Sequence, residues 1–222
     1  QYPPEWEKQR VVWLSWPYNK EDWIGKNFEE IRKFYIKLIS IILDFQDVNL
    51  IFSDKKMLND FKTTYKLSKT KNKLTKIIIP TDRIWIRDYG PFFLECNKKP
   101  LILDFRFNSW GEKFPPWNLD DKVSKKIAKY KKLKIESYPI ILEGGSIEFS
   151  GDGLILTTEQ CLLNKNRNPN LSKIGIENIL KSAFNIEEII WLKPGLEGDH
   201  TDGHIDDVAR FVDPKTILIY QK

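Results

Sequence analysis

Apolar runs alternate with amphipathic and hairpin segments along the chain, and this order constrains the fold more than any other feature. Residues 11–16 and 48–52 are apolar and predict buried strands. Between them, residues 28–43 repeat apolar side chains every three or four positions, which predicts an amphipathic helix. A second helical stretch at 55–65 leads to another strand at 76–80. The first third of the chain therefore alternates strand and helix.

Hairpins then interrupt this rhythm. They are expected, in chain order, between 92–95 and 101–107 across the turn 97–100, between 146–149 and 154–158, and around Asp213-Pro214. Helices at 122–134 and 171–184 are each followed by an expected strand, at 136–142 and 187–192. A doubly wound parallel sheet has no place for hairpins, so we predict an α/β (α+β) fold built from a repeated mixed module. Because no low-complexity linker divides the sequence, we expect one domain over 1–222.

The composition indicates a globular protein and excludes several classes. Of the 222 residues, 41% are hydrophobic and 13% aromatic, which is enough for a core. No run approaches the roughly 18 apolar residues of a membrane span, so we expect a cytoplasmic protein without a membrane partner. The net charge is +5, and lysines are concentrated at 122–134. The solvated face of a helix explains these lysines, so we expect no nucleic-acid partner. Cys96 and Cys161 form no disulfide or zinc-finger pattern.

Both histidines of the chain lie in one acidic segment, residues 198–211. Gly203 is flanked by polar residues and followed by an apolar run, which favours an extended strand. In a strand, alternate side chains share one face. His200, Asp202, His204 and Asp206 would then form a row. Such a row suits a metal ion, although one short strand rarely supplies a whole coordination sphere. It equally suits an organic cation with an acid/base group beside it.

Two further carboxylates follow expected strands and stand close to glycine. Asp88 precedes a Tyr-Gly-Pro sequence and could be no more than an ion-pair partner of Arg87. Glu143 follows an apolar run and precedes two glycines, and a carboxylate beside a buried strand needs a partner. Planar guanidinium is matched by carboxylates through paired charge-assisted hydrogen bonds. Asp88, Glu143 and Asp206 are candidates for such binding, with His204 transferring protons near neutral pH.

Four motifs occur along the chain in a defined order. They are Trp-Ile-Arg-Asp-Tyr-Gly-Pro, Leu-Glu-Gly-Gly-Ser-Ile-Glu, Thr-Glu-Gln-Cys-Leu-Leu-Asn-Lys-Asn-Arg-Asn-Pro and Asp-His-Thr-Asp-Gly-His-Ile-Asp-Asp-Val-Ala-Arg-Phe. Together they resemble agmatine deiminase and its relatives, the bacterial peptidylarginine deiminases, from about Trp13 to the end of the chain. The resemblance implies a five-bladed α/β propeller of repeated ββαβ modules. It also implies hydrolysis of agmatine in putrescine and polyamine metabolism, a homo-oligomer, and neither metal nor cofactor.

The resemblance further implies roles for individual residues. Asp88 and Asp206 would hold the substrate guanidinium, and Glu143 would pair with the substrate nitrogens and orient the general acid/base His204. Trp85 would line the pocket along the aliphatic arm of the substrate. These five residues are the predicted site.

The implied chemistry needs a cysteine that attacks the guanidinium carbon to form a covalent adduct, which water then hydrolyses. In the family that the chain resembles, this cysteine lies in a Gly-rich motif near the C-terminus. We expect it beyond residue 222. The chain would then be the N-terminal two-thirds of the family domain. Cys161 and Cys96 match no catalytic position of the family. His200 and Asp202 lie inside a motif but have no implied role, and we expect them to support the site from behind.

Three other functions remain open from the sequence. The substrate could be arginine in peptides rather than agmatine. The chain could bind guanidino compounds without turning them over. The His/Asp row could also belong to a metallohydrolase.

Overall fold

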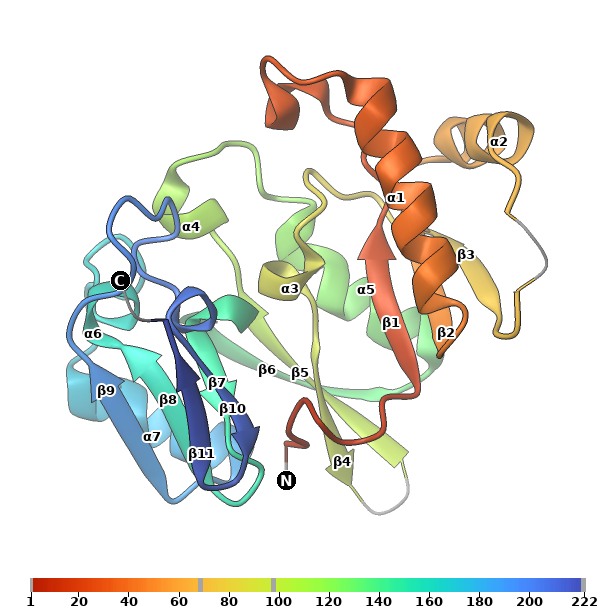
Figure 1. The fold of residues 1–222 in the computed structure, drawn as a ribbon. Helices are drawn as coiled ribbons and strands as arrows, with labels where there is room; N and C mark the ends of the chain where they lie inside the picture. Colours follow the sequence, from red (N-terminus) through yellow and green to blue (C-terminus); the bar gives the residue numbers. More distant parts are fainter. Residues whose placement is uncertain (1, 68–69, 97–98, 221–222) are drawn as a thin grey trace. The chain divides into compact units, whose positions relative to one another are not determined.

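The computed structural model describes residues 2–67, 70–96 and 99–220 and shows a mixed α/β chain (Figure 1). The chain consists of two compact units, Lys8–Ile86 and Gln1–Glu7 with Arg87–Lys222, and each is described on its own. Among the described residues, no helix combines the length and the apolar surface needed to cross a membrane.

The unit Lys8–Ile86 contains a parallel sheet whose strand order is β1-β2-β3. Its elements are β1 (Val11–Ser15), η1 (Lys20–Trp23), α1 (Phe28–Ile42), β2 (Asp47–Phe52), α2 (Lys55–Thr64) and β3 (Leu74–Ile78). Both helices are capped by side chains, because Asn27 accepts the backbone N–H of Glu29 and Asp54 accepts that of Met57. The predicted strands and helices of this third of the chain are confirmed, and β3 begins two residues earlier than expected.

The unit formed by residues 1–7 and 87–222 contains two copies of one mixed module. Each copy has an antiparallel hairpin, a helix and a strand that returns parallel to the hairpin, giving the orders β4-β5-β6 and β7-β8-β9. The first copy comprises β4 (Phe92–Cys96), β5 (Lys99–Arg106), α5 (Val123–Lys131) and β6 (Lys134–Ile141), and the second β7 (Ile147–Phe149), β8 (Leu154–Thr158), α7 (Lys173–Phe184) and β9 (Glu188–Leu192). The predicted repeated module is therefore confirmed here.

Short elements connect or follow these copies. They are α3 (Ile86–Tyr89), α4 (Ser109–Glu112), η2 (Asp120–Lys122), η3 (Gly144–Ser146), α6 (Glu159–Leu162) and η4 (Ile205–Asp207), followed by a hairpin of β10 (Ala209–Asp213) and β11 (Thr216–Ile219). All three predicted hairpin pairings are present. Part of the turn predicted at 97–100 lies outside the described residues, since these exclude Asn97 and Lys98.

Aromatic side chains from both copies of the module share one core. Phe92 and Phe105 of the first copy pack with Phe149 and Phe184 of the second. The rings of Phe105 and Phe184 stack with centroids 5.5 Å apart. The loop that follows β6 carries Glu143, and the segment that follows β8 carries Cys161 and Arg167, so the core lies next to part of the candidate site.

The prediction of an extended strand for the acidic segment is wrong. Residues 198–208 form turns and η4 and contain no strand. His200, Asp202, His204 and Asp206 therefore do not share one strand face. The cause is Asp199, whose carboxylate accepts the backbone N–H groups of Thr201, Gly203 and His204 at 2.8, 2.8 and 3.1 Å. These bonds cap a tight loop in which the chain reverses at positive φ.

Candidate functional site

Three separate segments of the second unit bring four of the predicted residues together. Asp88 lies in α3, Glu143 directly precedes η3, and His204 and Asp206 lie at the start of and within η4. The contact between η3 and η4 places the Gly-Gly sequence against the histidine loop. The proximity of these four residues, which their expected positions near strand ends suggested, is therefore a feature of the structure.

Asp88 is held by two donors in a buried position. Its Oδ1 accepts the backbone N–H of Gly145 and its Oδ2 accepts the indole N–H of Trp110, both at 3.0 Å. Burial, together with repulsion from Glu143 and Asp206, raises the pKa of Asp88 to about 7. The carboxylate is thus fixed in place while its charge is poorly satisfied, as expected where a cation is to bind.

The absence of a side chain at Gly145 makes the close approach of these groups possible. A Cβ built at this position would lie 2.4 Å from His204 Nδ1, 2.9 Å from Asp88 Oδ1 and 3.0 Å from Asp206 Oδ2. At Gly144 it would lie 2.0 Å from the carbonyl oxygen of Arg87. The prediction that these glycines allow close approach is therefore confirmed.

His204 faces two carboxylates without a close ion pair. Its Nδ1 is 3.7 Å from Asp88 Oδ1 and 3.9 Å from Asp206 Oδ1, both beyond hydrogen-bond length. Burial lowers the pKa of His204 to about 3, so the imidazole is neutral near pH 7. Burial also raises the pKa of Asp206 to about 6, although Arg87, whose Nε lies 3.8 Å from Asp206 Oδ2, opposes this shift.

Glu143 has a partner that the sequence did not reveal. Arg167 donates from Nε to Glu143 Oε1 at 2.9 Å, and both side chains are fully buried. Burial raises the pKa of Glu143, and Arg167 counteracts this effect. Arg167 also contacts the carboxylate of Asp202, which in turn binds Lys113. Asp202 thus contacts the partner of Glu143, and its supporting role stays a prediction.

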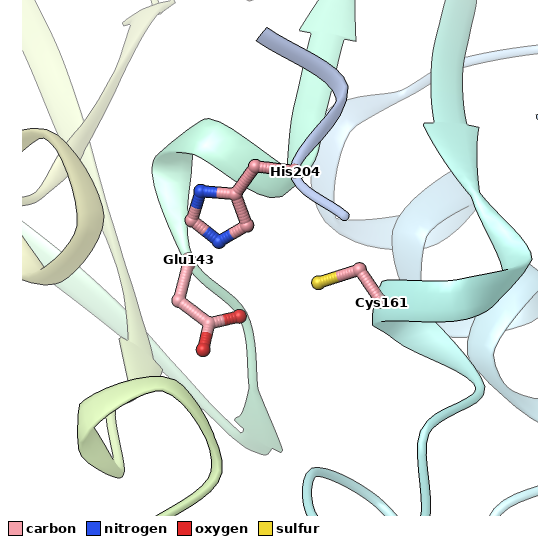
Figure 2. A group of neighbouring side chains, drawn as sticks. All are labelled: Glu143, Cys161 and His204. Carbon is pink, nitrogen blue, oxygen red and sulfur yellow. The ribbon is translucent and has the colours of Figure 1, made fainter. Parts of the chain in front are cut away.

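Cys161, which is not among the predicted site residues, also lies next to Glu143 and His204. Its Sγ, one carboxylate oxygen of Glu143 and one ring nitrogen of His204 lie within 4.8 Å of one another. Figure 2 shows the thiol of Cys161 directed toward these two side chains. Burial, together with the charge of Glu143, raises the pKa of this thiol well above its usual range. A thiol in this environment is mostly protonated and a weak nucleophile.

Trp85 and His200 are the remaining residues singled out from the sequence. Trp85 belongs to the unit Lys8–Ile86, where its indole stacks on that of Trp23 with centroids 6.0 Å apart. Its predicted role beside a substrate stays a prediction. His200 contributes its backbone carbonyl oxygen, which accepts a hydrogen bond from Lys113 Nζ at 2.9 Å.

The arrangement as a whole favours a planar cation. Three carboxylates with raised pKa values surround a neutral imidazole, and one oxygen of Glu143 and Nε2 of His204 are buried without a hydrogen-bond partner in the described structure. A cation that donates several hydrogen bonds would relieve the repulsion and satisfy these atoms.

Comparisons with known proteins show which family the chain resembles over its whole length. The model of the Porphyromonas-type peptidyl-arginine deiminase family matches residues 1–222. A Legionella pneumophila protein provisionally named agmatine deiminase is 35% identical over 97% of the chain. The structure of a cysteine-to-serine variant of C. jejuni agmatine deiminase with substrate bound is 39% identical, with a TM-score of 0.84 over 96% of the chain. The agmatine deiminase of Enterococcus faecalis is 31% identical, with a TM-score of 0.90 over the whole chain.

The chain spans only part of these relatives. It covers 61% of the Legionella protein and 62% and 61% of the two solved structures. The four converging residues thus lie in a chain that matches these deiminases over almost all of its own length.

Proposed function

The chain belongs to the Porphyromonas-type peptidyl-arginine deiminase family, and from this membership we propose that the complete protein hydrolyses the guanidinium of agmatine to N-carbamoylputrescine and ammonia. The observation that carries the proposal is the convergence of Asp88, Glu143, His204 and Asp206 in one unit. Two relatives of solved structure are named agmatine deiminases, which supports agmatine over other guanidino compounds.

In the proposed complex the carboxylates bind and orient the guanidinium. Asp88 and Asp206 both lie near Nδ1 of His204 and would pair with the guanidinium nitrogens through charge-assisted hydrogen bonds. Glu143 would use its free Oε2, since Arg167 occupies Oε1. The positive charge of the substrate would lower the pKa values of these acids and keep them ionised.

The proposed reaction proceeds through a covalent adduct. A cysteine sulfur bonds to the guanidinium carbon, the carbon–nitrogen bond breaks, and ammonia leaves with a proton carried by His204. In this step His204 would take the thiol proton and pass it to the leaving nitrogen. Since burial lowers its pKa to about 3, the neighbouring carboxylates of Asp88 and Asp206 would have to stabilise the protonated ring. Water activated by His204 then replaces the sulfur. We assign the attack to a cysteine beyond residue 222, since burial holds Cys161 protonated and Cys96 lies exposed on β4.

The same chemistry on arginine in peptides is the second candidate, because the matching family is described by that substrate. The two repeated β-β-α-β units, β4 to β6 and β7 to β9, support the further proposal that the complete domain is a five-bladed propeller. A place in putrescine biosynthesis, a cytoplasmic location and a homo-oligomer remain proposals that accompany the agmatine assignment.

Substrate binding and ammonia release test the proposal. Calorimetry should show that the chain binds agmatine more tightly than a peptide amide with a C-terminal arginine, and that Glu143→Gln weakens binding at least 10-fold. Glu188→Gln, at an exposed position of β9, is the control for the loss of one carboxylate and should bind as the unchanged chain does. In the complete protein, His204→Ala should abolish ammonia release while agmatine still binds. Brisk turnover of the peptide with none of agmatine would select the second candidate, and no binding of either would refute both.

A further inference from the structure

Three buried side chains from separate segments lie close together (Figure 2). The carboxylate of Glu143, the thiol of Cys161 and the imidazole of His204 each offer one atom, and these atoms lie within 4.8 Å of one another. Carboxylate oxygen, cysteine sulfur and imidazole nitrogen are the donors that zinc takes in proteins. The proposed deimination uses Glu143 and His204 but gives the thiol of Cys161 no role.

Two of the three donors have an atom prepared for a ligand. Oε2 of Glu143 and Nε2 of His204 are buried and have no hydrogen-bond partner in the described part of the chain. Leaving such an atom unpaired costs about 1–3 kcal/mol, which a bound ligand recovers. Arg167 binds the other carboxylate oxygen of Glu143 and so fixes this side chain with Oε2 free. The sulfur of Cys161 makes one long contact, 3.9 Å from the carbonyl oxygen of Thr201.

We propose that Glu143, Cys161 and His204 bind a Zn²⁺ ion, and that the ion excludes the guanidinium substrate from the site. Coordination would run through Glu143 Oε2, His204 Nε2 and Cys161 Sγ, with water as the fourth ligand. The S–H bond of Cys161 breaks, a sulfur–zinc bond forms and the proton leaves to solvent, so no electron is transferred. The exclusion of substrate rests on the proposed function, whereas the binding of the ion does not.

The surroundings of the histidine support this ligand set. A zinc-bound imidazole usually directs its second nitrogen at a carboxylate, which fixes the ring and its tautomer. Here Nδ1 of His204 faces Asp88 Oδ1 at 3.7 Å and Asp206 Oδ1 at 3.9 Å, which leaves Nε2 for the metal.

The distances require a modest adjustment of the side chains. Zinc bonds of about 2.0–2.3 Å in a tetrahedron place ligand atoms roughly 3.3–3.8 Å apart. Donors within 4.8 Å of one another would therefore move together by on the order of 1 Å, which side-chain rotation supplies. Asp206, whose Oδ1 lies 3.9 Å from His204 Nδ1, remains partly exposed.

A cobalt titration tests the metal site independently of catalysis. Co²⁺ replaces Zn²⁺ in such sites and gives a near-ultraviolet charge-transfer band when a thiolate is bound. When Co²⁺ is added to the metal-free protein, this band should appear. Cys161→Ser should abolish the band, and Cys96→Ser, the matched control at the exposed cysteine, should keep it. Glu143→Gln, which retains the thiol, should weaken cobalt binding at least 10-fold, and provides the second measurement if Cys161→Ser does not fold. A band that survives Cys161→Ser, or an affinity unchanged in Glu143→Gln, overturns the site.

Competition with agmatine tests the exclusion. Agmatine should raise the apparent dissociation constant for Co²⁺ in proportion to its own concentration. If calorimetry shows bound agmatine while the cobalt affinity stays unchanged, the exclusion is refuted and the metal site stands. If agmatine does not bind at all, the proposed function fails and the exclusion fails with it, while the cobalt band still decides whether the metal site exists.

Discussion

Replacing Asp88 with asparagine should change the pH dependence of stability in a defined direction. Asp88 has a pKa of about 7 in the folded chain, against about 3.9 in an unfolded one. A carboxyl whose folded pKa is raised stabilises the fold below its unfolded pKa, and this stability is lost as the pH rises through the folded pKa. The chain therefore loses stability at Asp88 between about pH 4 and pH 7, whereas asparagine does not titrate.

The size of the change follows from the shift in pKa. Three pKa units correspond to about 4 kcal/mol, and because Asp206 and Glu143 share the repulsion, we expect about 2–4 kcal/mol. Asparagine also places an amide group against one of the two donors of Asp88, the N–H of Gly145 or that of Trp110. This mismatch costs about 1–3 kcal/mol at every pH. Asp88→Asn should therefore be less stable than the unchanged chain at pH 4 and recover about 2–4 kcal/mol relative to it by pH 8.

Urea unfolding followed by tryptophan fluorescence at pH 4 to 8 and constant ionic strength measures this difference. Asp60→Asn, an exposed aspartate of α2, controls for the loss of one negative charge. A stability difference between Asp88→Asn and the unchanged chain that stays constant within about 0.5 kcal/mol across this range would refute the reasoning. It would mean that burial and neighbouring acids do not perturb Asp88.

Three further predictions concern the site. Agmatine affinity should rise from pH 5 to pH 8, because carboxyls with pKa values of about 6 and about 7 must ionise to pair with the cation; calorimetry in buffers of different ionisation enthalpy should show proton release, and a flat affinity would contradict it. Arg167→Met should destabilise the fold by about 3–5 kcal/mol in urea unfolding, because it leaves Glu143 buried without its cation; a loss below about 1 kcal/mol would count against a buried ion pair. Gly145→Ala should weaken agmatine binding at least 10-fold in calorimetry, because its Cβ meets His204 Nδ1, whereas Gly175→Ala in α7 has room for a Cβ and should leave binding unchanged.

The fold could be predicted from sequence wherever local periodicity decides the structure. The amphipathic repeat of α1 and the hairpin turns are local signals, and these elements are present within a few residues of their expected ends. The acidic segment was predicted wrongly because its alternation of side chains resembles a strand. What decides its conformation is a cap, in which Asp199 accepts three backbone N–H groups and the chain reverses at Asp202 and Gly203. A pattern of side-chain polarity does not report such bonds.

The site divides in the same way. Asp88, Glu143 and the histidine loop could be inferred because each follows an expected strand or lies in a recognisable motif. Arg167 and Cys161 also lie in one of the motifs, but their contacts could not be inferred, because the motif gives no sign of the buried groups that these two side chains meet. One signal could have found Arg167: a carboxylate as deeply buried as Glu143 requires a buried cation, and Arg167 is the arginine in the motif that follows it in the sequence.

The raised pKa values of the acids at the site are best explained by electrostatic repulsion and burial that a bound cation would offset. Carboxyls with raised pKa values destabilise the folded chain near neutral pH, yet the donors that hold Asp88 and the missing side chain at Gly145 keep these groups close together. A packing defect would relax by moving the acids apart, whereas these hydrogen bonds prevent such movement. The neutral state of His204 fits the same account, because a protonated imidazole would neutralise the acids and compete with an incoming cation. If the proposed cation binds here, it recovers the free energy lost in assembling the acids. Asp88→Asn should then recover stability relative to the unchanged chain as the pH rises and, for the same reason, lose affinity for agmatine.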